Sequence, residues 1–330
     1  MIILSHVRGL LRYGVRFRKA RGWAHKGLLV CLLAFEEPPS CESVGEVAGR
    51  VAQAKMKVPY VLSAALAALM VAQSVLGRVF PGQYRDVEWI RATWFGNDWV
   101  TLVVGAPLLG ASLLLARRGS IRGLLLWLGM LGYGAYNYAY YMLGAALNAF
   151  FPLYVVALVL SVVTLILALS RIDVAGVAAH FRANTPVRIV GGYLVFVAVG
   201  LTFVWMVMWA AYVFAGRPTP VETEAFKLVA TLDTTIMVPA LAFGGVLLWR
   251  RNAWGYIVAA IAGIQGSLYL LVLSINSVVL IIRGLAEAPG ELPQWGILAV
   301  TTTAATVLLL VNVRRVGRNG DPQNLGRSVA

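Results

Sequence analysis

Residues 105–129 read GAPLLGASLLLARRGSIRGLLLWLG, an apolar run, a short turn with three arginines, and a second apolar run. The two runs extend outward to residues 99–116 and 123–143, and neither contains a charged residue. A helix rises about 1.5 Å per residue, so each run is about long enough to cross the roughly 30 Å hydrocarbon core of a bilayer. This stretch therefore predicts a helical hairpin that crosses a membrane twice.

Six further stretches of this kind follow one another along the chain, and Asp233 is the one acidic residue within them. Backbone polar groups in lipid have to be satisfied within their own segment, which favours helices. The sequence thus predicts an all-α integral membrane protein with about eight transmembrane helices. The predicted spans are Pro59–Gly77, Trp99–Ala116, Gly123–Leu143, Phe150–Ser170, Ile189–Gly216, Leu228–Trp249, Asn252–Ile282 and Leu292–Val313.

The composition agrees with a chain that is solvated mostly by lipid. Only 13% of its 330 residues are charged, about half the share of a soluble domain, and 60% are hydrophobic. The net charge of +14 comes from basic residues before residue 59 and at the ends of the spans. That distribution is typical of membrane orientation and not of a nucleic-acid-binding face, so membrane lipids are expected as partners and nucleic acid is not.

The basic residues also predict the orientation. Alternate connections, starting with the N-terminal segment, carry 22 Lys and Arg, whereas the connections on the other side carry six. Cytoplasmic connections carry the positive excess, so both termini are expected in the cytoplasm and the protein in the cell membrane.

The chain is expected to have three parts: a basic N-terminal segment (1–57), a transmembrane bundle (58–316) and a cytoplasmic tail (317–330). In the first, Arg8, Arg12 and Arg16 recur every four residues, as in a helix that lies on anionic lipid. The interpretation that we favour is that the segment is disordered, with Met56 as a possible true start.

An internal repeat is a further interpretation. Residues 237–263, MVPALAFGGVLLWRRNAWGYIVAAIAG, resemble the opening stretch at an offset of about 132, with a proline near the start and an arginine pair at the end of the first helix in each. Four helices in each half make the two repeats parallel. The alternative is that any two apolar hairpins written in Leu, Ala and Gly look alike.

The sequence predicts no catalytic residue, metal site or cofactor. The spans contain neither Cys nor His, since Cys31, Cys41, His6, His25 and His180 all lie outside them. This argues against haem, zinc or thiol chemistry within the membrane.

Polar residues do gather in the predicted outer half of the spans. Tyrosines and Asn137 recur every three or four residues along the third span, which places them on one helical stripe. An ionised Asp233 at mid-bilayer costs about 2.5–3.5 kcal/mol, so it needs a partner, water or a proton. The candidate partners are the loop residues Arg85, Arg91, Arg217 and Lys227. The predicted substrate-binding residues are Asp233, Asn137, Tyr133, Tyr136, Tyr140, Tyr141 and Asp98.

Each of these residues also has a structural interpretation. Membrane-surface aromatic residues, among them Trp205, form belts at the interface. Asn97 and Asp98 are expected to cap the start of the second span. Residues 81–98 are expected either to fold as a short surface helix that covers the site or to form an ordinary interfacial connector.

Four short patterns, YRD (84–86), FGND (95–98), VTL (100–102) and YNY (136–138), resemble an uncharacterised family of prokaryotic multi-pass membrane proteins. The resemblance covers residues 56–170 and implies a prokaryotic cell-membrane protein, without implying an activity. From the residues themselves we expect a non-enzymatic protein that binds or transports a small solute at an outward-facing site. Two alternatives stay open: an enzyme acting on lipid or quinone, and a scaffold or sensory subunit of a membrane complex.

Overall fold

The computed structural model describes residues 41–314. The chain divides into two units, residues 1–54 and 55–330, and the described part of the first unit is helical. The expectations for residues 1–40 and for the tail at 317–330 lie outside the described residues.

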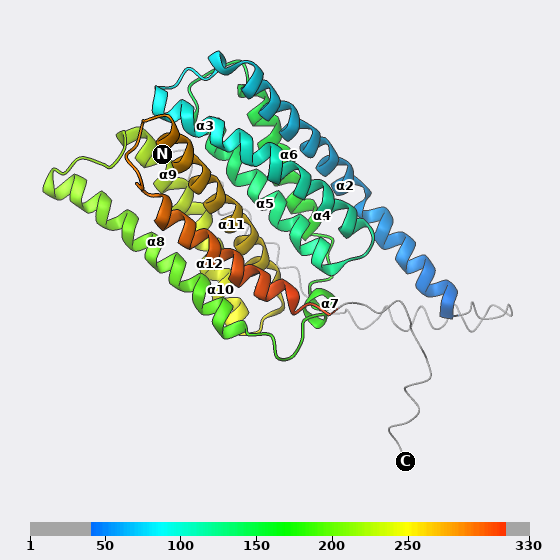
Figure 1. The fold of residues 1–330 in the computed structure, drawn as a ribbon. Coiled ribbons are helices and arrows are strands. Elements are labelled where there is room, and N and C mark those ends of the chain that lie inside the picture. The colour runs from blue at the N-terminus through cyan, green and yellow to red at the C-terminus, as the bar shows by residue number, and fades with distance from the viewer. Residues whose placement is uncertain (1–40, 315–330) are drawn as a thin grey trace, which may run out of the picture. The chain divides into compact units, whose positions relative to one another are not determined.

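In the described part of the second unit, eight helical rods lie side by side, and the first of them is the part of α2 from residue 55 on (Figure 1). Two of them contain a π-helical segment, η3 or η4, between two α-helices. The rods are α2 (Cys41–Val79), α3 (Glu88–Val100) with η3 (Thr101–Gly105) and α4 (Ala106–Arg117), α5 (Ile121–Gly144), α6 (Phe151–Leu169), α8 (Val187–Ala215), α9 (Thr223–Leu232) with η4 (Asp233–Met237) and α10 (Val238–Trp249), α11 (Ala253–Ile282), and α12 (Leu292–Val311). The connections contain a 3₁₀ turn, η2 (Pro81–Gln83), and α7 (Val174–Ala179).

Seven of these rods are long and apolar enough to cross a membrane, which confirms the all-α multi-pass class. The eighth, α5, has 24 residues and so extends about 36 Å, but its tyrosines and glycines make it more polar. It packs against α4, α6 and α11, and most of its side chains are buried within the protein. A helix that faces protein does not need an apolar surface, so α5 meets the length requirement of a span without the hydropathy of one.

Several boundaries of the second and third rods in each half recur at the offset of 132. The π-helical segments begin at Thr101 and Asp233, and the rods that contain them end at Arg117 and Trp249. The two following turns also match. Gly119 and Arg251 have positive φ angles of 79° and 55°.

The helix caps after these turns match as well. Ser120 accepts a hydrogen bond from Gly123 N at the start of α5, and Asn252 accepts one from Trp254 N at the start of α11. Such caps satisfy backbone N–H groups that the first turn leaves free. The second and third rods of each half thus share these features at the offset of 132, whereas the fourth rods, α6 and α12, begin 141 residues apart.

The halves meet at a crossing of α5 and α11, the equivalent helices. A methyl group added to Gly129 would lie within 2.7 Å of Ile264 side-chain atoms, and one added to Gly132 would lie 3.0 Å from Ile261 Cγ2. At the offset of 132, Gly129 corresponds to Ile261 and Gly132 to Ile264, so the two pairs are equivalent with the helices exchanged. Glycine therefore lets the two central helices approach closely at both points.

Of two helix boundaries predicted from turn and capping residues, the structure confirms one and contradicts the other. The turn expected at residues 144–152 is confirmed, because α5 ends at Gly144, α6 begins at Phe151, and Asn148 Oδ1 accepts from Phe150 N at 2.8 Å. The expected cap at Asn97 and Asp98 is wrong. The helix begins ten residues earlier, at Glu88, and continues into the span, so residues 88–98 do not form a separate surface helix over the site.

Candidate functional site

A layer of buried polar side chains crosses the bundle near the end at which α3 and α9 begin and α5 and α11 finish. Asp98 and Asp233 each lie ten residues into their rods, about 15 Å from the first residue. Tyr136, Asn137 and Asn276 lie about 9–12 Å from the last residue of α5 or α11. Polar groups from separate rods therefore occupy similar depths.

Asp98 is fully buried and accepts three side-chain hydrogen bonds. Tyr84 Oη donates to Oδ2 at 2.8 Å, while Tyr141 Oη and Gln73 Nε2 donate to Oδ1 at 2.9 and 3.0 Å. The donors come from α2, the connection after η2, and α5. The carboxylate thus links four segments of the first half, and these three hydrogen bonds compensate its burial.

Tyr84, which lies between the spans, is held as a hydrogen-bond donor. Burial raises the pKa of its hydroxyl far above the ordinary value of 10, and the neighbouring Asp98 carboxylate raises this pKa further. The hydroxyl therefore stays protonated. Its ring lies 5.8–6.4 Å from the rings of Trp94, Phe95 and Phe150.

Asp233 is also buried, with 3% of its surface exposed, and it joins the two halves. Tyr136 Oη, on α5, donates to Oδ1 at 2.5 Å, and Trp205 Nε1, on α8, donates to Oδ2 at 3.0 Å. Trp205 and Gln73, a donor to Asp98, are equivalent at the offset of 132. The basic partner expected from the loops is not found among the described residues: Lys227 pairs with Glu224 at 3.7 Å.

The seven predicted residues are distributed over several contacts rather than one site. Tyr141 joins Asp98, and Tyr136 joins Asp233, on different sides of α5. Tyr133 shares a 3.3 Å hydrogen bond with Thr101 on η3. The Tyr140 ring lies 5.0 Å from the Trp94 ring.

Asn137, the remaining predicted residue, belongs to a group of buried amides without full partners. Its Nδ2, both side-chain atoms of Asn97, and Oδ1 of Asn276 have no hydrogen-bond partner among the described residues. An unsatisfied buried polar group costs about 1–3 kcal/mol. The three amides lie on α5, α3 and α11, so these helices offer polar groups for water or a polar solute.

A cavity of about 470 Å³ opens at the same end of the bundle, between α3 and α5 of the first half and α9 of the second. Its aromatic wall consists of Trp89, Trp94 and Tyr140. This volume lies within the range of roughly 300–1,000 Å³ that is usual for small-molecule sites. Of the seven predicted substrate-binding residues, Tyr140 is the one that lines this cavity.

The charged wall of this cavity has more acidic than basic groups. Asp86, Glu222 and Glu224 line it together with Lys227. Asp86 accepts from Trp94 Nε1 at 3.0 Å and from Ala146 N at 2.9 Å, which fixes its carboxylate beside the turn after α5. The formal charge of these four side chains is −2.

The sequence analysis did not identify Tyr84 as a hydrogen-bond donor to Asp98. It also did not identify Asp86 as part of the cavity wall. Both residues lie in a segment whose sequence is typical of an interfacial connector. The sequence also favoured an interfacial role for Trp205, which instead donates to Asp233. For Trp205 the repeat offered a signal in the sequence, whereas for Tyr84 and Asp86 it offered none. Gln73 and Trp205 occupy matching positions one span before Asp98 and Asp233.

The fold and the polar layer define a multi-pass helical membrane protein with buried carboxylates and an open cavity at one end. Comparisons of the chain with protein-family models, with curated proteins and with solved structures find no match. The function therefore has to be argued from the geometry of the site.

Proposed function

We propose that this protein is a non-enzymatic membrane protein that binds or transports a small, positively charged organic solute. The observation that carries the proposal is the 470 Å³ cavity between the halves, with its aromatic wall. Cations are attracted to the faces of Trp and Tyr rings by about 0.5–2 kcal/mol. Trp89 and Tyr140 are partly exposed there, so a ligand has access to both.

The charged wall supports a cation in preference to an anion. Three carboxylates and one ammonium group line the cavity, and Lys227 is already paired with Glu224.

The excess of basic residues on the opposite side supports an outward-facing cavity. The turns after α4 and α10 carry arginine pairs, Arg117 with Arg118 and Arg250 with Arg251, at the end away from the cavity. With these turns in the cytoplasm, the cavity opens to the exterior of a cell membrane. The short-pattern resemblance to prokaryotic multi-pass proteins is consistent with this location.

The test is a titration of the purified full-length protein in detergent with tetramethylammonium chloride, with sodium chloride at the same ionic strength as the reference. We expect saturable binding that the double variant Glu222→Gln/Glu224→Gln weakens about three- to tenfold, because two exposed charges contribute about 0.2–1 kcal/mol each. The matched control is Glu287→Gln/Glu291→Gln, which removes two exposed carboxylates outside the cavity.

Two results contradict the proposal. One is the absence of saturable binding. The other is an equal loss of affinity in the two double variants, which would mean that the acidic wall acts only through the net charge of the protein.

A further inference from the structure

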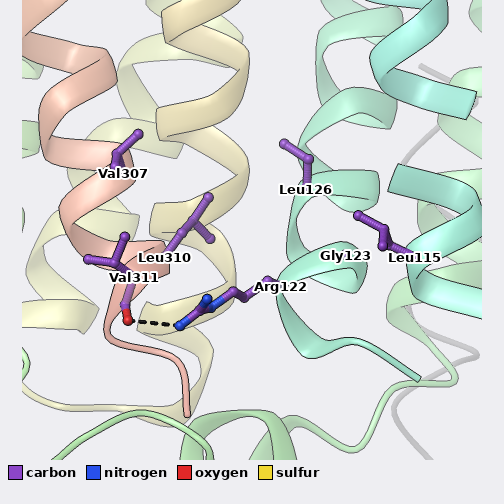
Figure 2. Close-up of a pocket in the computed structure, with 7 residues that line it drawn as sticks. All are labelled: Leu115, Arg122, Gly123, Leu126, Val307, Leu310 and Val311. Atoms are coloured by element: carbon purple, nitrogen blue, oxygen red, sulfur yellow. Dashed lines mark hydrogen bonds between the residues drawn. The ribbon is translucent and has the colours of Figure 1, made fainter. Parts of the chain in front are cut away.

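A second cavity, of about 160 Å³, lies at the opposite end of the bundle (Figure 2). Leu115 and Leu126 approach it from α4 and α5, and Val307, Leu310 and Val311 approach it from α12. Leu115, Val307 and Val311 are 42–50% exposed, so the cavity faces the surroundings of the bundle rather than its interior. In a membrane these surroundings are lipid chains.

Arg122 is the charged residue on the wall of this cavity. Its Nη2 donates to the carbonyl oxygens of Val311 at 3.0 Å and Val313 at 2.6 Å (Figure 2 shows the guanidinium directed toward α12). Its Nε is buried and has no acceptor among the described residues. The two carbonyl groups are neutral, so no negative charge in the cavity wall compensates the guanidinium.

The surroundings of Arg122 are positive as well. Arg117 and Arg118 precede it in the turn before α5, and Arg314 directly follows Val313. The N-terminus of α5, which begins at Ile121, adds a partial positive charge. A basic site next to an apolar groove between transmembrane helices has the chemistry that recognises an anionic lipid.

We propose that this cavity binds an anionic phospholipid, with the phosphate beside Arg122 and a segment of one acyl chain against Leu126 and Leu310. The proposal does not depend on the solute cavity, because the two sites lie at opposite ends of the bundle and share no residue. A volume of 160 Å³ holds only part of a lipid, so the remainder would lie on the outer surface of α4 and α12.

The experiment compares dioleoyl phosphatidylglycerol with dioleoyl phosphatidylcholine, which have the same chains, as ligands of the full-length protein in mild detergent. Native mass spectrometry measures occupancy and thermal unfolding measures stabilisation. We expect phosphatidylglycerol to bind at least tenfold more tightly, and inorganic phosphate alone to give no stabilisation.

Three variants test the geometry. Arg122→Gln should reduce the preference for phosphatidylglycerol at least fivefold, and Arg122→Lys, which keeps the charge, should retain it within about threefold. Arg251→Gln is the matched control, because Arg251 lies at the same end and also donates to a backbone carbonyl, that of Ala183, but lines neither cavity. Leu126→Trp, which fills the groove without a change of charge, should weaken the binding of phosphatidylglycerol.

The proposal is overturned if Arg122→Gln and Arg251→Gln reduce binding equally, since this would indicate non-specific attraction. It is also overturned if Leu126→Trp leaves lipid affinity unchanged, or if inorganic phosphate stabilises the protein as well as the lipid does. Unfolding temperatures without lipid separate a loss of binding from a loss of folding in each variant.

Discussion

Replacement of Tyr84 by Phe removes a buried hydroxyl that makes two hydrogen bonds, one donated to the Asp98 carboxylate and one accepted from Gln73 Nε2 at 3.2 Å. The change removes the hydroxyl that donates to Asp98 Oδ2 at 2.8 Å and leaves the ring in contact with Trp94, Phe95 and Phe150. Because the pKa of this hydroxyl is raised by burial, the wild-type group is a donor at every pH at which the protein is studied.

The expected loss of unfolding free energy follows from the number and type of bonds. A hydrogen bond to a charged group contributes about 1.5–3 kcal/mol, and Asp98 keeps two of its three donors in the variant. Packing changes little, since Phe has the shape of Tyr. We therefore expect Tyr84→Phe to lower the unfolding free energy by about 2 kcal/mol.

The assay is reversible unfolding in mixed micelles, carried out as a double-mutant cycle with Asp98→Asn. The cost of Tyr84→Phe should fall by about 1 kcal/mol or more when it is measured in the Asp98→Asn variant, because residues in contact are energetically coupled. Tyr256→Phe serves as the control. Tyr256 is buried and its ring centroid lies 4.4 Å from that of Phe181, but its hydroxyl makes no hydrogen bond to a described residue. Equal costs in the two backgrounds, or a cost as small as that of the control, would refute the assigned hydrogen bond.

Two further predictions use the same unfolding assay. Gly129→Ala should destabilise the protein by about 1–3 kcal/mol, because the new methyl group would lie within 2.7 Å of Ile264 atoms. Gly132→Ala should cost less, since the nearest contact of its methyl group is at 3.0 Å. A reversed order would contradict the close crossing of α5 and α11. Asp233→Asn should cost about 1–3 kcal/mol, because the Tyr136 and Trp205 hydrogen bonds to a charged carboxylate are replaced by weaker bonds to a neutral amide. An unchanged unfolding free energy would contradict these two hydrogen bonds to the carboxylate.

The helices were predictable because lipid imposes a length and a composition on each span. The hairpin at residues 105–129, its repeat at 237–263 and the turn before Pro152 all follow from apolar runs and from the residues that end them. The true start of α3, ten residues before Asp98, was not predictable in this way. The amphipathic start of α3 is buried by neighbouring helices and not by lipid, so the apolar run begins after the helix does.

The sequence predicted where along the spans the polar residues lie, but it did not predict which of them form hydrogen bonds with each other. The spacing of Tyr136 and Tyr141 places both at similar depths on α5, but which carboxylate each one meets depends on the crossing of separate helices. Tyr141 bonds Asp98 within its own half, and Tyr136 bonds Asp233 of the other half. Such pairings arise from tertiary packing, which a pattern within one span does not contain.

The most direct test of this account is whether α5, the least apolar rod, crosses the membrane with its polar layer toward the exterior. Single cysteines at Arg118 and at Leu147, both exposed positions on either side of α5, are introduced after Cys31 and Cys41 are replaced by Ser. A membrane-impermeant maleimide added to intact cells should label the cysteine at 147, and should label the one at 118 only after the cells are permeabilised. Labelling of both positions from the same side, or of position 118 alone in intact cells, would contradict the account.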